Sequence, residues 1–510
     1  MEEDTRKVTP VMVCITNAHD TTQILIPPKG DKAGVPTEIP LFMKGIQYSA
    51  DKNWVGPVRL TNGLGNNENR SGLYGMLPSL PYWHEPVMYQ TSGDFSITLP
   101  AGDWRIALQH GNEYIPIADT LHVTPKKRSL VKTYVLKRWI NMPQRGWLSG
   151  DVHVHHPTNN PSFKEYLLQF GRAENVHMLN MLEMGHHLGT DFKVDGFGKA
   201  FRMCRDNVCL VSGQEDPRTE NGHIIGLNID YQVRDTSTYN YYDNVFKGLH
   251  MQPGALVGYA HFSWNGFHKG FPWHLATGEI DFVELLQFLR LNTIDYYDVL
   301  NLGFKITAAA GSDFPWASTI GDVRTFAYTG NDFSPDAWFL ALKEGHTFVT
   351  NGPALFMEAD GKLPGTQITS ASGTVTQIKA KALSNPFIGN ITRVAIYNNE
   401  GLVSEKMNTD NADSVSMTVP HTLLKSQWLS AVVYCDNGAV AHTTPVYFMV
   451  DGKPTFDKNK APAIIQKQVE AIQKLKDEEN AKPNIDKGLI GRYVNAIDFY
   501  RKLLSEVNAD

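Results

Sequence analysis

The sequence lacks any apolar stretch long enough to span a membrane, and it has no long run of basic residues. A membrane-spanning helix needs about 20 mainly apolar residues, and binding to nucleic acid or to anionic membranes usually depends on clustered Lys and Arg. Here 47 Lys and Arg stand against 53 Asp and Glu, which gives a formal net charge of −6. We therefore expect neither nucleic acid nor a membrane as a partner.

Cysteine is also scarce. The 510 residues contain four, namely Cys14, Cys204, Cys209 and Cys435. Four are too few for a disulfide framework, and Cys204 and Cys209 have neither the CxxC spacing nor the partners of a zinc knuckle. We expect packed or free thiols.

A recognisable signal peptide is missing from the start of the chain. Met1-Glu2-Glu3-Asp4 has neither the basic nor the apolar region that such a peptide requires. A chain from which a leader had been removed would look the same, so a secreted or periplasmic location stays open beside a cytoplasmic one.

The chain is longer than a single hydrophobic core usually serves, so we expect several domains. Residues 1–140 contain short runs of alternating apolar and polar residues, such as Val11–Ile15, Phe95–Leu99 and Trp104–Leu108. These runs predict an N-terminal β-sandwich domain. Residues 354–453 have the same character and predict a second, C-terminal β-sandwich.

Two further segments have a different pattern. Residues 141–353 alternate short apolar strands with helical patterns, which is typical of an α/β fold built as a parallel sheet or barrel. Residues 454–510 carry helix-forming residues with apolar positions near a spacing of 3.6, interrupted at Pro483. They predict a helical hairpin that packs back on the body.

The segment Gly150-Asp-Val-His-Val-His155 carries the strongest chemical signal. In a strand, residues i and i+2 face the same side, so His153 and His155 can direct two imidazoles at one metal ion. The alternative is a pair of histidines on an exposed β face, and this segment alone does not decide between the two.

Four more ligand-type residues lie at the ends of apolar strands in the central segment, namely Glu215, His223, His261 and Asp313. The C-terminal ends of the strands of a parallel barrel converge on one face, where active sites form. A single residue of this kind usually has only a structural role. Because all four lie at strand ends, however, the set favours a metal site. Imidazole and carboxylate ligands suit Zn, Mn or Fe.

The order of these motifs resembles that of the PHP (polymerase and histidinol phosphatase) metallohydrolases: Gly-Asp-x-His-x-His, Gly-x-Glu, Gly-His-Ile, a strand-terminal His and Gly-Ser-Asp. Flanking features are more similar to the CehA/McbA branch, named for carbaryl hydrolases. They are Arg138-Trp139 before Gly146-Trp147, Ala173-Glu174-Asn-Val-His177, Gly321-Asp-Val-Arg324, Thr350-Asn-Gly-Pro353 and His442-Thr-Thr-Pro445. The resemblance covers the chain from about residue 95 to about residue 450.

This resemblance implies a distorted (β/α)7 barrel, flanked by the two β-sandwiches, with two divalent ions at the C-terminal ends of its strands. The matching positions for the first ion are His153, His155, Glu215 and Asp313. Those for the second ion are Glu215, His223 and His261, so that Glu215 bridges the ions. Zn is the expected metal, with Mn or Fe as alternatives.

The sequence departs from the family at a third ion site. Many PHP proteins bind a third ion through a Thr-Asp-His element and through a His two residues after the Gly-Ser-Asp aspartate. Here these positions read Glu183-Met-Gly185 and Pro315, so both ligands are missing. His186 and His187 are candidate substitutes, but adjacent loop histidines are more often supporting or surface residues. The sequence therefore predicts two ions rather than three.

Three residues are candidates for catalytic roles. Asp313, or a nearby histidine such as His187, could pass a proton to the leaving group. Arg324 could hold an oxyanion, since its guanidinium offers a fixed fork of donors. The alternative for Arg324 is a structural salt bridge, for example with Asp322.

Aromatic residues crowd the loops after two proposed ligands. Phe262, Trp264, Phe267, Phe271 and Trp273 surround His268 and His274, while Phe314 and Trp316 follow Asp313. These aromatics either pack the loops or form an apolar wall for a substrate, and their place directly after the ligands favours the wall. The few cationic candidates nearby are Arg218, Lys269 and Arg324. This balance disfavours a doubly charged phosphate monoester.

We therefore expect a metal-dependent hydrolase that attacks a carboxylester, carbamate or amide bond in a small-molecule substrate with an apolar part. Hydrolysis of a phosphodiester or phosphomonoester, as in the wider PHP group, is the alternative among enzymes. A non-catalytic binding or scaffold protein is the alternative of another class, against which the intact ligands at all six positions argue. A homo-oligomer stays open.

Overall fold

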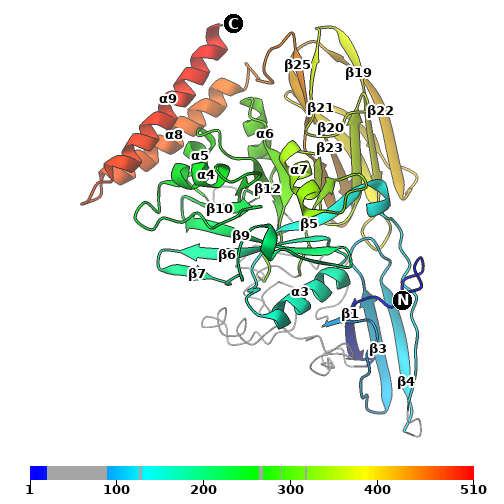
Figure 1. Cartoon of the computed structure of the whole chain (residues 1–510). Helices are drawn as coiled ribbons and strands as arrows, with labels where there is room; N and C mark the ends of the chain where they lie inside the picture. Colours follow the sequence, from blue (N-terminus) through cyan, green and yellow to red (C-terminus); the bar gives the residue numbers. More distant parts are fainter. Residues whose placement is uncertain (20–88, 126–128, 264–267, 289, 316–318, 510) are drawn as a thin grey trace.

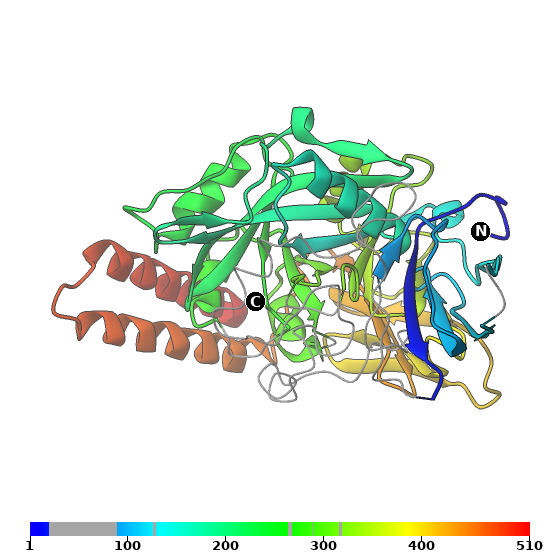
Figure 2. The same ribbon diagram turned by 90° about the horizontal axis from the view of Figure 1, so that it is seen from below.

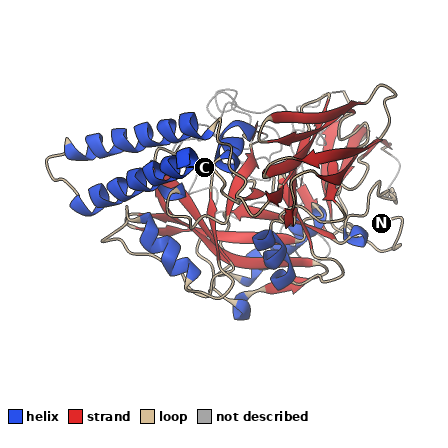
Figure 3. Cartoon of the chain, turned by 90° about the horizontal axis from the view of Figure 1, so that it is seen from above, coloured by secondary structure: helices blue, strands red, loops and turns tan. Residues whose placement is uncertain are grey.

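The computed structural model describes residues 1–19, 89–125, 129–263, 268–288, 290–315 and 319–509. Its architecture is mixed α/β, with a large multi-stranded sheet and several helices (Figure 1). A smaller N-terminal sheet, β layers built from residues 354–450 and a pair of long C-terminal helices flank the central part (Figure 3).

The N-terminal part forms a four-stranded antiparallel sheet in the order β2-β1-β3-β4. Its strands are β1 (Val11–Asn17), β2 (Tyr89–Thr91), β3 (Gly102–Gln109) and β4 (Ile117–Val123). The predicted strand Phe95–Leu99 is not a strand, because it pairs with no neighbour among the described residues. Its alternate apolar side chains rest on the core of the sheet instead. The described N-terminal residues show one layer here, where the sequence predicts two.

Two groups of parallel strands form the central part. The first group is β5 (Trp147–Val154), β6 (Met178–His186) and β9 (Val208–Thr219), and the second is β11 (Leu256–Tyr259), β12 (Phe282–Gln287) and β14 (Thr307–Ala310). Every residue of β5, β11, β12 and β14 is buried, as expected for strands covered on both faces. The connecting helices are α3 (Pro161–Ala173), α4 (Tyr242–His250), α6 (Thr293–Asn301) and α7 (Pro335–Glu344).

Two strands run against these groups. β10 (Gly222–Leu227) follows β9 through a tight turn and pairs antiparallel with both β9 and β11. β15 (Arg324–Tyr328) pairs antiparallel with β5 and with β16 (Thr347–Thr350). The expected alternation of strand and helix is therefore broken between β9 and β10. Because β10 is antiparallel, its first residues lie at the same edge of the sheet as the last residues of β9 and β11.

Short elements extend the central sheet. β7 (Gly189–Asp191), β8 (Met203–Arg205) and β13 (Arg290–Leu291) pair with β6, β9 and β12, and two 3-10 turns span Pro143–Arg145 and Lys199–Phe201. Cys204 of β8 lies directly opposite Cys209 of β9, and the two form a disulfide. The prediction of free thiols is wrong for this pair, because the hairpin register brings the two cysteines together. Cys14 and Cys435 are buried thiols, as expected.

Residues 354–450 form two β layers with an apolar core between them. One layer is β17-β19-β22, with bounds Ala354–Ala359, Thr374–Leu383 and Ser414–Leu423. The other contains β18 (Gln367–Ser370), β20 (Ile391–Asn398), β21 (Gly401–Met407), β23 (Gln427–Cys435), β24 (Val440–Thr443) and β25 (Val446–Val450). β24 also pairs with β16, so this layer is continuous with the central sheet.

The C-terminal tail is a hairpin of two long helices, α8 (Ala461–Asn480) and α9 (Lys487–Ala509), which lie side by side (Figure 2). The hairpin packs on α6 and on the short helix α5 (Phe271–Leu275). The Tyr500 hydroxyl donates to the carbonyl of Pro272 at 2.8 Å. The predicted helical hairpin and its contact with the body are thus present. None of the helices in the described ranges combines the length and apolar character needed to cross a membrane.

The segment His442-Thr-Thr-Pro445 joins the C-terminal layers to the central part. His442 is fully buried; its Nδ1 donates to the carbonyl of Thr443 at 2.7 Å, so its Nε2 accepts from the Tyr297 hydroxyl of α6 at 2.9 Å. Thr444 accepts a hydrogen bond from the amide of Ala308 in β14. Both ring nitrogens of His442 are hydrogen-bonded in the neutral form, and burial lowers its pKa to about 4.

This buried histidine makes stability depend on pH. In the unfolded chain His442 is protonated below about pH 6.5, whereas in the folded protein it stays neutral down to about pH 4. The free energy of unfolding therefore falls as the pH decreases from about 6.5 to about 4. The expected slope is about 1.4 kcal/mol per pH unit for one such group. Urea unfolding at pH 7, 6 and 5 measures it. We expect His442→Gln to have a shallower slope than the wild type, whereas His122→Gln, at an exposed position, should keep the wild-type slope; equal slopes for all three proteins would contradict this.

Candidate metal centre

The structure brings the six predicted ligands together at one edge of the central sheet. His153 and His155 come from the end of β5, and Glu215 comes from the last part of β9. His261 lies two residues after the end of β11 and Asp313 lies three residues after the end of β14, while His223 is the second residue of β10. The antiparallel direction of β10 explains how a residue at the beginning of a strand joins residues at the ends of others.

His153, His155 and Asp313 form one group of potential ligand atoms. The Nε2 atoms of the two histidines lie 3.0 Å apart. They lie 3.3 Å and 3.5 Å from Oδ1 of Asp313, respectively. Both imidazoles are fully buried, so this group excludes the alternative of two histidines on an exposed β face.

Glu215 lies between this group and a second one. Its Oε2 is 3.2 Å from Nε2 of His155. Its Oε1 is 3.6 Å from Nε2 of His153, 3.5 Å from Nε2 of His261 and 2.9 Å from Nδ1 of His223. One carboxylate therefore contacts four imidazoles from three other strand ends.

The backbone turns sharply at two of the ligands. His261 and Asp313 have φ angles of +58°, a left-handed conformation that is uncommon for residues with a side chain. Each turn redirects the chain at the end of its strand. The turn at Asp313 is held by its amide, which donates to the carbonyl of His153 at 2.8 Å. Such conformations cost about 1 kcal/mol or more and cluster at functional sites.

A further set of polar residues orients the imidazoles. Glu284 of β12 accepts from Nδ1 of His153 at 2.9 Å and from the amide of His261 at 2.8 Å. Nδ1 of His261 lies 2.7 Å from Oε1 of Gln287, and Nδ1 of His155 lies 3.0 Å from the carbonyl of Leu182. Nε2 of each of these rings therefore faces the centre of the cluster, as in metal sites whose histidines are fixed by a second hydrogen bond.

The sequence analysis missed Glu284 and Gln287. The available signal was an acid and an amide inside the otherwise apolar run Phe282–Gln287. Their role depends on the order of the strands in the sheet, which the sequence does not reveal. Because β12 lies beside β11, its side chains reach the ligands at the neighbouring strand ends.

The electrostatics of the cluster favour bound positive charge. Burial alone would lower the pKa of His153, but Glu284, Asp313 and Glu215 raise it well above its ordinary value. Burial would raise the pKa of Glu215, but Arg218 and the neighbouring histidines hold it well below its ordinary value. Two buried carboxylates that face several imidazoles provide the donor set that borderline divalent metals prefer. These buried groups could therefore hold a metal ion.

Arg218 is the cation nearest to the ligands. Its Nε lies 2.6 Å from Oε2 of Glu215, and its side chain remains 23% exposed. It follows Glu215 by three residues on the same strand. This position suits contact with a bound molecule.

His268 joins the cluster although the sequence analysis did not propose it as a ligand. Ligand atoms of His223, His261 and His268 lie within 4.8 Å of one another. His268 is buried. Its spacing of seven residues from His261 matches no metal-binding motif, which is why the sequence did not indicate it.

Arg324 and His187 lie outside the cluster. Arg324 is fully buried and donates to the carbonyl of Gly321 at 2.9 Å and to the side chain of Asn112 at 3.0 Å. This geometry favours the structural alternative for Arg324 over the oxyanion contact. His187 is exposed, and its ring packs against Tyr239.

The region of the missing third site is filled by an ion pair. A Cβ on Gly185 would come within 2.1 Å of Asp216. Asp216 binds Nη1 of Arg234 and the hydroxyl of Tyr239, each at 2.6 Å. His186 lies 3.7 Å from Asp191 within its own hairpin. The absence of a third ion stays a prediction.

A cavity of about 220 Å³ adjoins the cluster. Its floor includes His261 and His268, and α8 supplies one of its walls. The lining is Tyr259, His261, Phe262, His268, Lys269, Phe271, Pro272, Asp295, Val299, Lys467, Gln468 and Ala471.

The cavity tests the predicted aromatic wall. Phe262 and Phe271 line it. Trp273 belongs instead to the hydrophobic core against Tyr242, and Phe314 packs on Phe170. Trp264, Phe267 and Trp316 lie outside the described residues.

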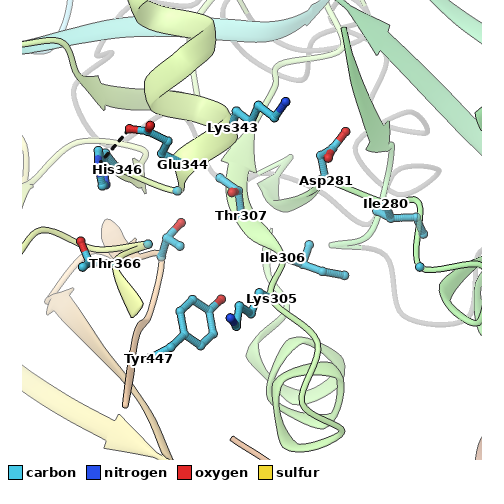
Figure 4. A pocket seen from close by; sticks show the side chains of 14 residues that line it. Ile280, Asp281, Lys305, Ile306, Thr307, Lys343, Glu344, His346, Thr366 and Tyr447 are labelled. Atoms are coloured by element: carbon cyan, nitrogen blue, oxygen red, sulfur yellow. Dashed lines mark ion pairs between the residues drawn. The ribbon is translucent and has the colours of Figure 1, made fainter. Parts of the chain in front are cut away.

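A larger cavity of about 600 Å³ lies at the other end of the strands (Figure 4). Ile280 and Asp281 precede β12 there, and Lys305 and Ile306 precede β14. Tyr447 contributes from the C-terminal layers. Because the six ligands gather at the opposite ends of these strands, this cavity does not belong to the candidate metal centre.

No protein-family model matches the chain, and no curated protein matches it. Among solved structures, fibronectin(III)-like modules of CbhA from Clostridium thermocellum match with 18% identity, over 18% of this chain and 93% of that chain, at a TM-score of 0.15. A superoxide reductase (neelaredoxin) from Ignicoccus hospitalis matches with 16% identity, over 19% of this chain and 81% of that chain, at a TM-score of 0.14. Scores this low carry no inference about fold or activity.

The role of Glu284 can be tested directly. We expect Glu284→Gln to weaken Zn²⁺ affinity by about 10- to 100-fold, the usual effect of losing such a supporting carboxylate, while the isosteric amide preserves the fold. Competition with a chromophoric chelator measures the affinity, and circular dichroism checks the fold. Glu279→Gln is the matched control, since Glu279 pairs with His250 on the surface. Unchanged affinity in Glu284→Gln would mean that this carboxylate does not support the ligands.

Proposed function

We propose that this chain is a metal-dependent hydrolase of the PHP kind, similar to the CehA/McbA branch, and that its central strands form a distorted (β/α)7 barrel. Two divalent ions, Zn in the first place, are held by His153, His155, Glu215, His223, His261 and Asp313. The observation that carries the proposal is the buried carboxylate of Glu215, which lies between two groups of imidazoles.

Divalent ions held by these residues would polarise the bond to be cleaved and lower the pKa of a bound water toward neutrality. Asp313 is the proposed proton-transfer residue, because its side chain is 12% exposed, whereas that of Glu215 is fully buried. It accepts the proton of the attacking water and passes it to the leaving group. His187 is a weaker candidate for this role, since its ring packs on Tyr239 at the surface.

Arg218 replaces Arg324 as the residue that contacts an oxyanion. Its guanidinium lies beside Glu215 and is partly exposed, whereas Arg324 is fully buried among backbone carbonyls. A fixed fork of donors at this place suits the developing negative charge of a carbonyl or phosphoryl oxygen.

The adjoining cavity supports an ester-like substrate with an apolar part. Phe262, Phe271 and Val299 line it beside His261, and burial of an apolar group there contributes about 25 cal/mol per Å². One arginine beside the ligands suits a neutral or singly charged group better than a phosphate dianion. A carboxylester, carbamate or amide fits this balance. Phosphodiester hydrolysis is the second candidate, favoured by Arg218.

A non-catalytic scaffold is the weakest explanation. Burying ionisable groups is costly unless they are paired or bind a metal. A scaffold gains nothing from four imidazoles and two carboxylates in one buried place, because apolar residues would pack there at lower cost.

The hydrolase proposal predicts which substrates are preferred. With Zn²⁺ or Mn²⁺ present, we expect kcat/KM for a naphthyl or nitrophenyl carboxylester to exceed that for the matching phosphomonoester at least tenfold, which is about 1.4 kcal/mol. His153→Ala and Glu215→Ala should each lose this activity while circular dichroism stays close to that of the wild type. A tenfold preference for the monoester would favour the phosphatase alternative, and activity retained in both variants would refute the metal site.

The cavity predicts a size-dependent effect. Ala471 of α8 faces it, so Ala471→Trp should fill the space and lower kcat/KM for a naphthyl ester about tenfold more than for a nitrophenyl acetate. Lys474→Trp, at an exposed position of the same helix, is the control and should affect both esters equally. A uniform loss in Ala471→Trp would place the apolar group elsewhere.

A further inference from the structure

His268 has surroundings that differ from those of an ordinary buried histidine. Its ring centroid lies 4.7 Å from that of His223 and 5.6 Å from that of His261, and these two rings are 5.0 Å apart. The three rings therefore form a compact triangle. Each offers a ligand atom within 4.8 Å of the other two, and Glu215 contacts two of them directly.

His274 provides a contrast in the same part of the chain. It too is fully buried, but its ring stacks on Tyr242 at 4.2 Å and meets Trp273 edge-on at 4.1 Å. These are the contacts of a histidine that fills an apolar core. His268 instead lies close to two other imidazoles. These rings would repel one another if they were protonated, whereas neutral imidazoles at this spacing can bind one cation together.

We propose that His268 is a metal-ligating residue that gives the ion beside Glu215 a third imidazole, together with His223 and His261. The inference rests on the metal site of the proposed function and adds a ligand to it. Three imidazoles and one carboxylate form a four-donor set of the type that Zn²⁺ accepts. The ion held by His153, His155 and Asp313 would have a different set of donor atoms, so the two sites should differ in their affinity for Zn²⁺.

The position of His268 links metal binding to the cavity. His268 and Lys269 line the cavity together with Phe271, which begins α5. An ion bound to His268 therefore anchors the chain at the place where it enters the wall of the cavity. Metal occupancy and the shape of the proposed substrate site would then change together.

Zinc binding tests the proposal without recourse to activity. Metal-free wild type, His268→Gln and the control His274→Gln are titrated with Zn²⁺ against a chromophoric chelator, and the bound zinc is counted by elemental analysis. We expect two equivalents in the wild type and in His274→Gln. His268→Gln should keep the first and bind the second at least tenfold more weakly. Affinity for the second equivalent within twofold of the wild type would overturn the role of His268.

A second measurement does not depend on the folding of a variant. Crystals of the zinc-loaded wild type should show, by anomalous diffraction, a ring nitrogen of His268 within about 2.0–2.1 Å of an ion. An ion held by His223 and His261 with His268 turned away would refute this inference and leave the proposed function intact. Wild-type protein that binds no zinc in either measurement would refute both.

Discussion

A carboxylate that has been removed from water is costly to keep ionised unless positive groups surround it, and Glu215 is such a carboxylate. Its neighbours come from four different parts of the chain: His155 directly after β5, His223 from β10, His261 after β11 and Arg218 from its own strand. The strand ends of the central sheet must therefore meet at this point. The direction of β10 and the closure between β5 and the segment after β14 both serve that convergence.

The same constraint explains where the backbone departs from regular geometry. His261 and Asp313 adopt left-handed backbone conformations after the ends of two strands. Residues in regular strands do not adopt this conformation. The amide of His261 donates to Glu284, and the amide of Asp313 donates to the carbonyl of His153. The hydrogen bonds that stabilise these turns thus involve the residues that orient the cluster, so local strain and ligand placement are held by one network.

Much of the candidate site could be predicted from the sequence, because ligand-type residues at strand ends are a local feature. The pair His153 and His155 needs only the alternation of a strand, and the helical tail needs only its 3.6-residue period. Glu284 and His268 could not be found in this way. The role of Glu284 depends on which strand lies beside which, and that of His268 on residues that are close in space without any regular spacing in the sequence. The buried position of Arg324 could not be predicted for the same reason, since a sequence does not tell whether an arginine faces a cleft or the protein interior.

Fold prediction failed where pairing partners decide the outcome. Phe95–Leu99 has the alternation of a strand but pairs with no other strand in the part of the chain that the structure describes. Cys204 meets Cys209 only because β8 and β9 form a hairpin in one register.

The place of α8 has a consequence for the order of folding. Lys467 of α8 pairs with Asp295 of α6 although 172 residues separate them in the sequence, and the same helix closes one side of the cavity. A chain that is still emerging from the ribosome has made every proposed ligand well before it has made this helix. Domains generally fold during synthesis from the N-terminal side, so the nascent protein would pass through a stage in which the ligands are present and Phe271 and Val299 still face water.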